Sequence, residues 1–210
     1  MPSRKTILTS LACGEVASWF FLIIFYTLEF QTKAAASFPV LPVEKLAWSV
    51  LIVFPLLFLF GLFVAYFLGK FLKVFYQLVK FVEVGVLNTL VDLGILSLLM
   101  AVTGIAGGIW YPVFKAISFL TATTNSYFWN KIWTFQKEGF EEAGKEFSEF
   151  LIVSGVGLGI NVGSASVVVN WIGPQFGLSS DVWGVIGGII AALCGMTWNF
   201  LGYKFLVFNK

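Results

Sequence analysis

Long apolar stretches alternate with short polar connections along nearly the whole chain. A helix needs about 20 predominantly apolar residues to cross the ~30 Å hydrocarbon core of a bilayer. Three stretches of at least this length carry no charged side chain: 46–69, 150–180 and 182–203. The second of these has to include its own exit turn, near Gly173 and Pro174. The pattern predicts a membrane-spanning helix in each stretch.

Three further apolar stretches are interrupted by polar residues and are also expected to span: 10–28, 81–102 and 109–131. Together the pattern predicts an all-α membrane helix bundle of about six transmembrane helices. The connections between the stretches are short, so we expect no soluble catalytic domain and no enzyme activity.

Composition supports lipid as the solvent of this chain. Hydrophobic residues make up 59% of 210 positions and charged residues 11%, whereas about a quarter of a soluble domain is charged. The net charge of +2 is too small to indicate a nucleic-acid partner. Histidine is absent, and Cys13 and Cys194 lie far apart in apolar stretches. We therefore expect buried inert thiols, no metal site and no cofactor.

The basic residues predict the orientation. With six spans, three of them fall on one side of the membrane, namely Lys33, Lys45 and Lys115. Ten fall on the other side: Arg4, Lys5, Lys70, Lys73, Lys80, Lys131, Lys137, Lys145, Lys204 and Lys210. Lys and Arg accumulate on the cytoplasmic side of membrane proteins. The sequence therefore predicts a multi-pass protein of the inner (cytoplasmic) membrane with both termini in the cytoplasm.

The last four predicted spans contain an internal repeat. "FVEVGVLNTLVD" aligns with "FLIVSGVGLGIN", and "NSYFWNKIWTF" aligns with "WNFLGYKFLVF". These alignments place Asp92 over Asn161 and Lys131 over Lys204. Each repeat is a helical hairpin that enters and leaves the membrane on the cytoplasmic side, so the two hairpins are predicted to be parallel.

At these residues the chain resembles the GtrA-like family of four-span membrane proteins. The resemblance rests on Gly85, 88–92, Asn125, Ser126, 130–135, 198–200, Lys204 and Phe208. It covers about residues 76–210 and leaves two predicted N-terminal helices, in 1–75, as a separate region. The family pattern usually has Arg where Lys131 and Lys204 stand.

The resemblance implies membrane translocation (flipping) of a polyprenyl-phosphate-linked sugar for cell-surface polysaccharide glycosylation. A similar four-span unit is fused to some dolichyl-phosphate-mannose synthase-like glycosyltransferases. The alternative is therefore a non-transporting membrane partner or anchor subunit of a glycosyltransferase. A small drug or ion transporter is a third hypothesis. The expected partners are the lipid-linked sugar, membrane lipids, a glycosyltransferase and, through glycine-rich helix seams, a second copy of the chain.

Polar side chains on one helix face mark a candidate substrate site. In 81–102, Gly85, Asn88, Thr89 and Asp92 are spaced by three and four residues, which places them on one face. At about 1.5 Å per residue, Asp92 is expected ~16 Å from the cytoplasmic end of this span, near the middle of the membrane. A carboxylate there costs about 2.5–3.5 kcal/mol, so it should face a cavity or a partner.

The other three spans of the repeats carry similar stripes. We predict that these stripes converge on one groove, where the sugar is bound by Asn88, Asp92, Lys115, Asn125, Asn161 and Asn199. Asparagine in membrane helices also serves to join helices, at about 0.6 kcal/mol each, and this interpretation stays open for Asn125, Asn161 and Asn199. Glu83 is expected near the interface, where it either reaches water or takes part in function.

Lys131 and Lys204 are expected to end equivalent helices at the cytoplasmic surface. They either extend to the interface without a specific ligand or bind a lipid phosphate, since an ammonium is a strong point charge. Both interpretations stay open.

Overall fold

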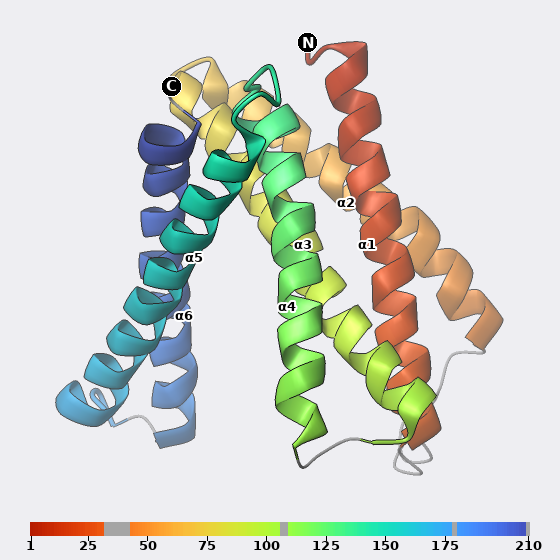
Figure 1. Cartoon of the computed structure of the whole chain (residues 1–210), viewed down its shortest axis with the longest axis vertical. Helices are drawn as coiled ribbons and strands as arrows, with labels where there is room; N and C mark the ends of the chain where they lie inside the picture. The colour runs from red at the N-terminus through yellow and green to blue at the C-terminus, as the bar shows by residue number, and fades with distance from the viewer. Residues whose placement is uncertain (32–42, 106–108, 178–179, 209–210) are drawn as a thin grey trace. The chain divides into compact units, whose positions relative to one another are not determined.

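The computed structural model describes residues 1–31, 43–105, 109–177 and 180–208 (Figure 1). All regular elements in these ranges are helical, which confirms the all-α prediction. The α-helices are α1 (Arg4–Gln31), α2 (Val43–Gly69), α3 (Lys73–Thr103), α4 (Trp110–Trp129), α5 (Ala143–Ser166) and α6 (Ser180–Gly202). Three π-helices extend them: η2 (Asn130–Thr134), η3 (Val167–Ile172) and η4 (Tyr203–Val207).

Five described segments are long and apolar enough to cross a membrane. They are Arg4–Thr27, Ala47–Gly69, Lys73–Thr103, Ala143–Ile172 and Ile186–Val207. The sixth helix, α4, has 20 residues and carries the polar positions Lys115, Ser118 and Asn125. The polar character of α4 sets it apart from the other five helices, and it is the helix that carries part of the candidate site.

The chain forms two compact units, Met1–Gln136 and Lys137–Lys210. The first unit contains α1 to α4 with η2, and the second contains α5, η3, α6 and η4. The domain boundary expected between residues 75 and 76 follows family resemblance rather than compactness. It stays a prediction.

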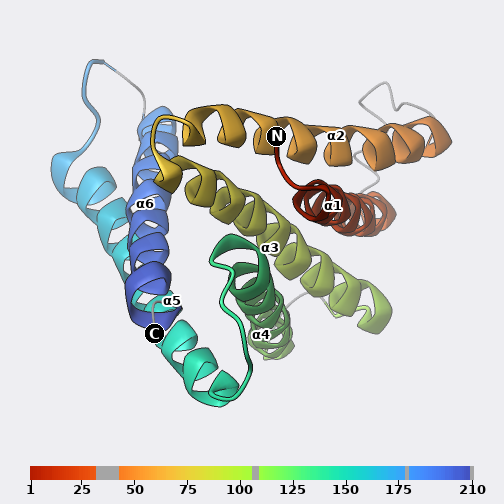
Figure 2. The ribbon, with the colours of Figure 1, turned by 90° about the horizontal axis from the view of Figure 1, so that it is seen from above.

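The first unit is a bundle of antiparallel neighbours. α1 and α2 run in opposite directions, as do α3 and α4 (Figure 1), and α1 packs against both α2 and α3 (Figure 2). Close approach is needed where Gly14 of α1 meets α2, because a Cβ at Gly14 would lie 2.5 Å from Pro55 Cα. The centre is filled by Cys13, Ala17, Phe58, Leu62, Val84, Leu87, Val91, Ala122 and Trp133.

The second unit is a helical hairpin of α5 and α6. η3 ends at Ile172, and Gly173 follows with φ of 68°, a conformation that suits glycine. The chain therefore leaves the helix where the exit turn was predicted. Near the opposite end of the hairpin, the rings of Phe150 and Tyr203 stack with their centroids 4.1 Å apart.

The same local feature closes both units. η2 spans Asn130–Thr134 and η4 spans Tyr203–Val207, so the two π-helices occupy equivalent positions in the predicted repeat. Each is followed by a backbone hydrogen bond of 2.9 Å, from Phe135 N to Asn130 O and from Phe208 N to Tyr203 O. π-helices are rare. Their shared length and register support the repeat and the pairing of Lys131 with Lys204.

Candidate functional site

The polar centre of the first unit is formed by one residue of α3 and two of α4. The Asp92 carboxylate forms an ion pair with the Lys115 ammonium through Oδ2. Its other oxygen, Oδ1, accepts a hydrogen bond of 2.6 Å from the Ser118 hydroxyl. Lys115 and Ser118 are three residues apart on α4, so both reach the same carboxylate. α4 thereby holds both oxygens of Asp92.

The ion pair is partly open to its surroundings. The side chains of Asp92 and Lys115 are 21% and 42% exposed, whereas Ser118 is fully buried. Each charge lowers the cost of placing the other in a membrane-spanning unit. The pair is therefore not sealed inside the unit.

Two amide groups extend this polar face along the same helices. Asn88 lies one turn before Asp92 on α3, and Asn125 lies two turns beyond Ser118 on α4. The Asn125 Oδ1 atom accepts a hydrogen bond of 3.0 Å from the Trp129 indole. Asn88 Oδ1 and Asn125 Nδ2 are buried and have no hydrogen-bond partner among the described residues. An unpaired buried polar group costs about 1–3 kcal/mol, and a hydroxyl group that reached these atoms would remove that cost.

In the second unit the predicted amides lie in a tight helix contact. A Cβ at Gly157 of α5 would lie 2.0 Å from Asn199 Oδ1 of α6. A Cβ at Gly195 of α6 would lie 3.2 Å from Asn161 Cβ of α5. Each asparagine therefore occupies the space above a glycine of the opposite helix. This geometry favours a role in packing for Asn161 and Asn199, and their convergence with Asp92 on one groove stays a prediction.

The two equivalent lysines have different surroundings. Lys131 is fully buried within η2, with its ammonium 3.5 Å from the Tyr127 hydroxyl. Lys204 is partly exposed, and its ammonium lies 5.7 Å and 5.6 Å from the ring centroids of Phe200 and Phe205. The Lys131 side chain is therefore enclosed by protein, whereas that of Lys204 is partly exposed. A role of both lysines in phosphate binding stays a prediction.

The sequence did not indicate that two charged residues near the start of α3 are buried. Lys80, expected in a cytoplasmic loop, is 2% exposed and donates a hydrogen bond of 3.4 Å to Trp133 O. Glu83, left open as an interfacial residue, is 7% exposed and accepts a hydrogen bond of 3.1 Å from Ser10. The predicted span began at residue 81, whereas α3 begins at Lys73, two turns before Lys80. An earlier helix start would have placed both residues inside the helix.

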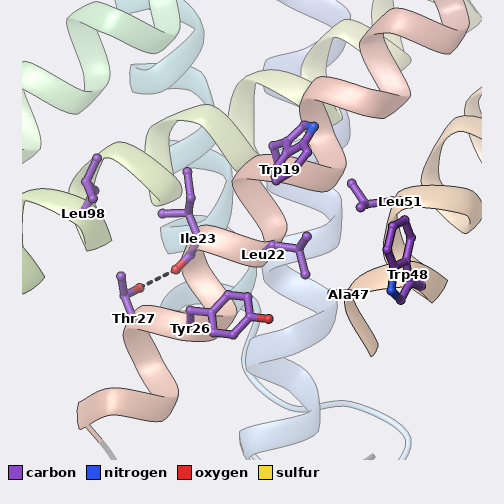
Figure 3. Close-up of a pocket in the computed structure, with 9 residues that line it drawn as sticks. All are labelled: Trp19, Leu22, Ile23, Tyr26, Thr27, Ala47, Trp48, Leu51 and Leu98. Atoms are coloured by element: carbon purple, nitrogen blue, oxygen red, sulfur yellow. Dashed lines mark hydrogen bonds between the residues drawn. The ribbon is translucent and has the colours of Figure 1, made fainter. Parts of the chain in front are cut away.

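A separate apolar pocket of about 560 Å³ lies between α1, α2 and the second half of α3 (Figure 3). It is lined by Trp19, Leu22, Ile23, Tyr26, Thr27, Ala47, Trp48, Leu51 and Leu98. The Thr27 hydroxyl is satisfied by the carbonyl oxygen of Ile23, at 2.8 Å. The lining suits a hydrocarbon chain rather than a sugar.

The fold and the apolar helices define a multi-pass membrane protein. Residues 80–208 match the family described as "GtrA/DPMS, transmembrane domain", and the chain belongs to this family. A relative, the "Uncharacterized membrane protein YngA" of Bacillus subtilis (strain 168), is 30% identical over 130 residues, which are 62% of this chain and 78% of the relative. No solved structure matches the chain. The family match includes the Asp92 site and both hairpins, whereas α1 and α2 lie outside it.

Proposed function

We propose that the protein flips a polyprenyl-phosphate-linked sugar across the inner (cytoplasmic) membrane, for glycosylation of a cell-surface polysaccharide. Family membership supports this class of protein. The distribution of the basic residues supports an orientation with both termini in the cytoplasm. The protein acts without chemistry of its own, as a carrier rather than an enzyme.

The observation that carries the proposal is the partly open ion pair between Asp92 of α3 and Lys115 of α4. A sugar headgroup in hydrocarbon loses its hydrogen bonds to water, at about 4–8 kcal/mol for each unpaired hydroxyl. The Asp92 carboxylate accepts hydrogen bonds from hydroxyl groups, and the unpaired Asn88 Oδ1 and Asn125 Nδ2 atoms supply an acceptor and a donor. The site thus replaces water for the sugar.

Lys115 gives the site a means of binding the phosphate as well. Its ammonium is more exposed than the Asp92 carboxylate that it contacts, and an ammonium binds phosphate as a strong point charge. When Lys115 contacts the lipid phosphate, the Ser118 hydroxyl continues to donate to Asp92. After this exchange the phosphate neutralises Lys115, and the Asp92 carboxylate keeps one hydrogen bond, from Ser118.

The lysines of the two π-helices are proposed as further phosphate ligands at the ends of the hairpins. η2 supports this for Lys131, because two buried donors, Trp133 Nε1 and Thr134 Oγ1, have no hydrogen-bond partner among the described residues. A phosphate oxygen would satisfy the Trp133 indole N–H. Lys204 holds the equivalent position in η4.

The test is transfer of a labelled polyprenyl-phosphate hexose across the bilayer of liposomes that contain the purified protein. Asp92→Asn should lower the rate at least about tenfold, the equivalent of 1.4 kcal/mol. Thr124→Val is the matched control on α4, because Thr124 is exposed and its hydroxyl donates to the Leu120 carbonyl oxygen of its own helix. A wild-type rate for Asp92→Asn would refute the assignment.

The same experiment tests the alternative of a non-transporting partner. A glycosyltransferase anchor would move no labelled lipid in liposomes but would co-purify with the enzyme. That pair of results would replace the flippase proposal.

A further inference from the structure

A second carboxyl group on α3 lies within the first unit, away from the ion pair. Glu83 is nine residues before Asp92 and only 7% exposed. Its Oε2 atom accepts a hydrogen bond of 3.1 Å from the Ser10 hydroxyl, and Ser10 is itself fully buried. Its Oε1 atom is buried and has no hydrogen-bond partner among the described residues. One oxygen is therefore satisfied and the other is not.

Three helices enclose this carboxyl group. α1 contributes Ser10 and the buried thiol of Cys13. α2 contributes Gly61, where a Cβ would lie 2.9 Å from Glu83 Oε1. The glycine leaves only enough room for the carboxyl group itself. Since α1 and α2 lie outside the family match, the enclosure is made by the part of the chain that the family does not account for.

Among the ionisable groups that face Glu83 is one cation, Lys80, which acts on the carboxyl group without contacting it. On α3 these are Lys80 and Tyr76, and on α1 the group is the thiol of Cys13. The Lys80 ammonium is directed elsewhere: it donates to Trp133 O at 3.4 Å and lies 4.4 Å from the Tyr76 ring centroid. No ion pair joins Lys80 and Glu83 in the described structure.

A carboxylate in such a position is a buried charge with one hydrogen bond and no ion pair among the described residues, which is unfavourable. A neutral carboxylic acid leaves only one O–H group without an acceptor, which costs far less. Asp92 differs, because Lys115 and Ser118 satisfy both of its oxygens. The surroundings of Glu83 therefore favour the neutral form of its carboxyl group.

We propose that Glu83 is a proton-binding site, closed by α1 and α2, that carries its proton at neutral pH. A proton from water adds to the carboxylate and forms an O–H bond at Oε1, while Oε2 remains the acceptor for Ser10. Release returns the proton to water. Use of this proton to drive transport rests on the proposed flippase function, whereas the binding of the proton to Glu83 does not.

The first test is infrared spectroscopy of the full-length protein in lipid bilayers, titrated with acid and base. Wild type shows a carboxylic C=O stretching band at neutral pH that disappears in strong base. Glu83→Gln loses this band, and Asp92→Asn retains it. The proposal is overturned if Glu83→Gln and the wild type have the same spectrum in the carboxylic C=O region at every pH.

A second variant keeps the carboxyl group and changes one hydrogen bond. Ser10→Ala removes the donor to Oε2, so the C=O band shifts to higher frequency because a hydrogen bond weakens the C=O bond. Gly85→Ala is the control on α3, since a Cβ there meets no atom within 4 Å, and its band stays in place. An unchanged band position in Ser10→Ala contradicts the assigned geometry.

These results are independent of transport. A protein that flips no lipid still shows the Glu83 band if the proton site is correct. Conversely, the wild type can flip the lipid while the band is unchanged in Glu83→Gln. In that case the proposed function stands and the proton site is rejected.

Discussion

The two hairpins of the repeat share their ends and differ in their centres. Both finish in a five-residue π-helix with a lysine at its second position. In the first unit, the middle of the α3–α4 contact holds an ion pair and unpaired amide atoms. In the second, the middle of the α5–α6 contact is closed by asparagine side chains above glycines. Asn199 Oδ1 is also buried without a hydrogen-bond partner among the described residues. The two copies therefore differ in the ion pair of the first and in the close fit of asparagine against glycine in the second.

The largest expected effect is on the packing of the second unit. Gly157→Ala places a Cβ where Asn199 Oδ1 lies, so the helices must move or the side chain must leave. We expect a loss of about 1–3 kcal/mol in the free energy of unfolding, as for other overpacked contacts. Thermal unfolding in detergent measures it.

Two further variants sharpen this prediction. Gly159→Ala is the control on the same helix, because a Cβ there meets no atom within 4 Å. Gly157→Ala combined with Asn199→Ala removes the overlapping atoms and should regain most of the stability. If all three variants unfold together with the wild type, the tight contact between Gly157 and Asn199 does not exist.

The next effect is on the ion pair of the first unit. Lys115→Met leaves Asp92 with Ser118 as its remaining partner. We expect a loss of about 1–2 kcal/mol in stability, between the values for exposed and for buried pairs, since both side chains are partly exposed. Thr121→Val, at an exposed position of α4, is the control in the same unfolding assay. Equal stability of the two variants would show that the pair contributes nothing.

The smallest effect distinguishes the amides of the two hairpins. Asn88→Ala should lower the flipping rate a few fold, because one hydrogen bond contributes about 0.6–1 kcal/mol. Asn161→Ala should leave the rate per folded protein unchanged, since Asn161 packs against Gly195. The liposome assay, normalised to the amount of folded protein, compares them. A larger loss for Asn161→Ala would reverse the assignment of the two hairpins.

Much of the fold follows from patterns along the chain. The apolar lengths predicted the helices, and the repeat predicted the equivalence that the two π-helices display. The three-residue spacing of Lys115 and Ser118 placed both on one face of α4. These features depend on local periodicity, which a sequence contains directly.

Features that depend on the contact between helices did not follow from the sequence. The pairing of Lys115 with Asp92 requires the relative register of α3 and α4. The packing of Asn199 on Gly157 requires the register of α5 and α6. The burial of Glu83 requires α1, which contributes Ser10 from 73 residues away in the chain. A periodicity argument contains none of these distances.

The most direct test of the account is the flipping rate of the double variant Asp92→Asn with Lys115→Gln. Removing both charges leaves no unpaired ion, so its stability should return close to that of the wild type. If the pair carries the sugar, the rate stays at least about tenfold below wild type, a difference of 1.4 kcal/mol. A double variant that is folded and flips at the wild-type rate would show that the pair only joins α3 to α4, and would contradict the account.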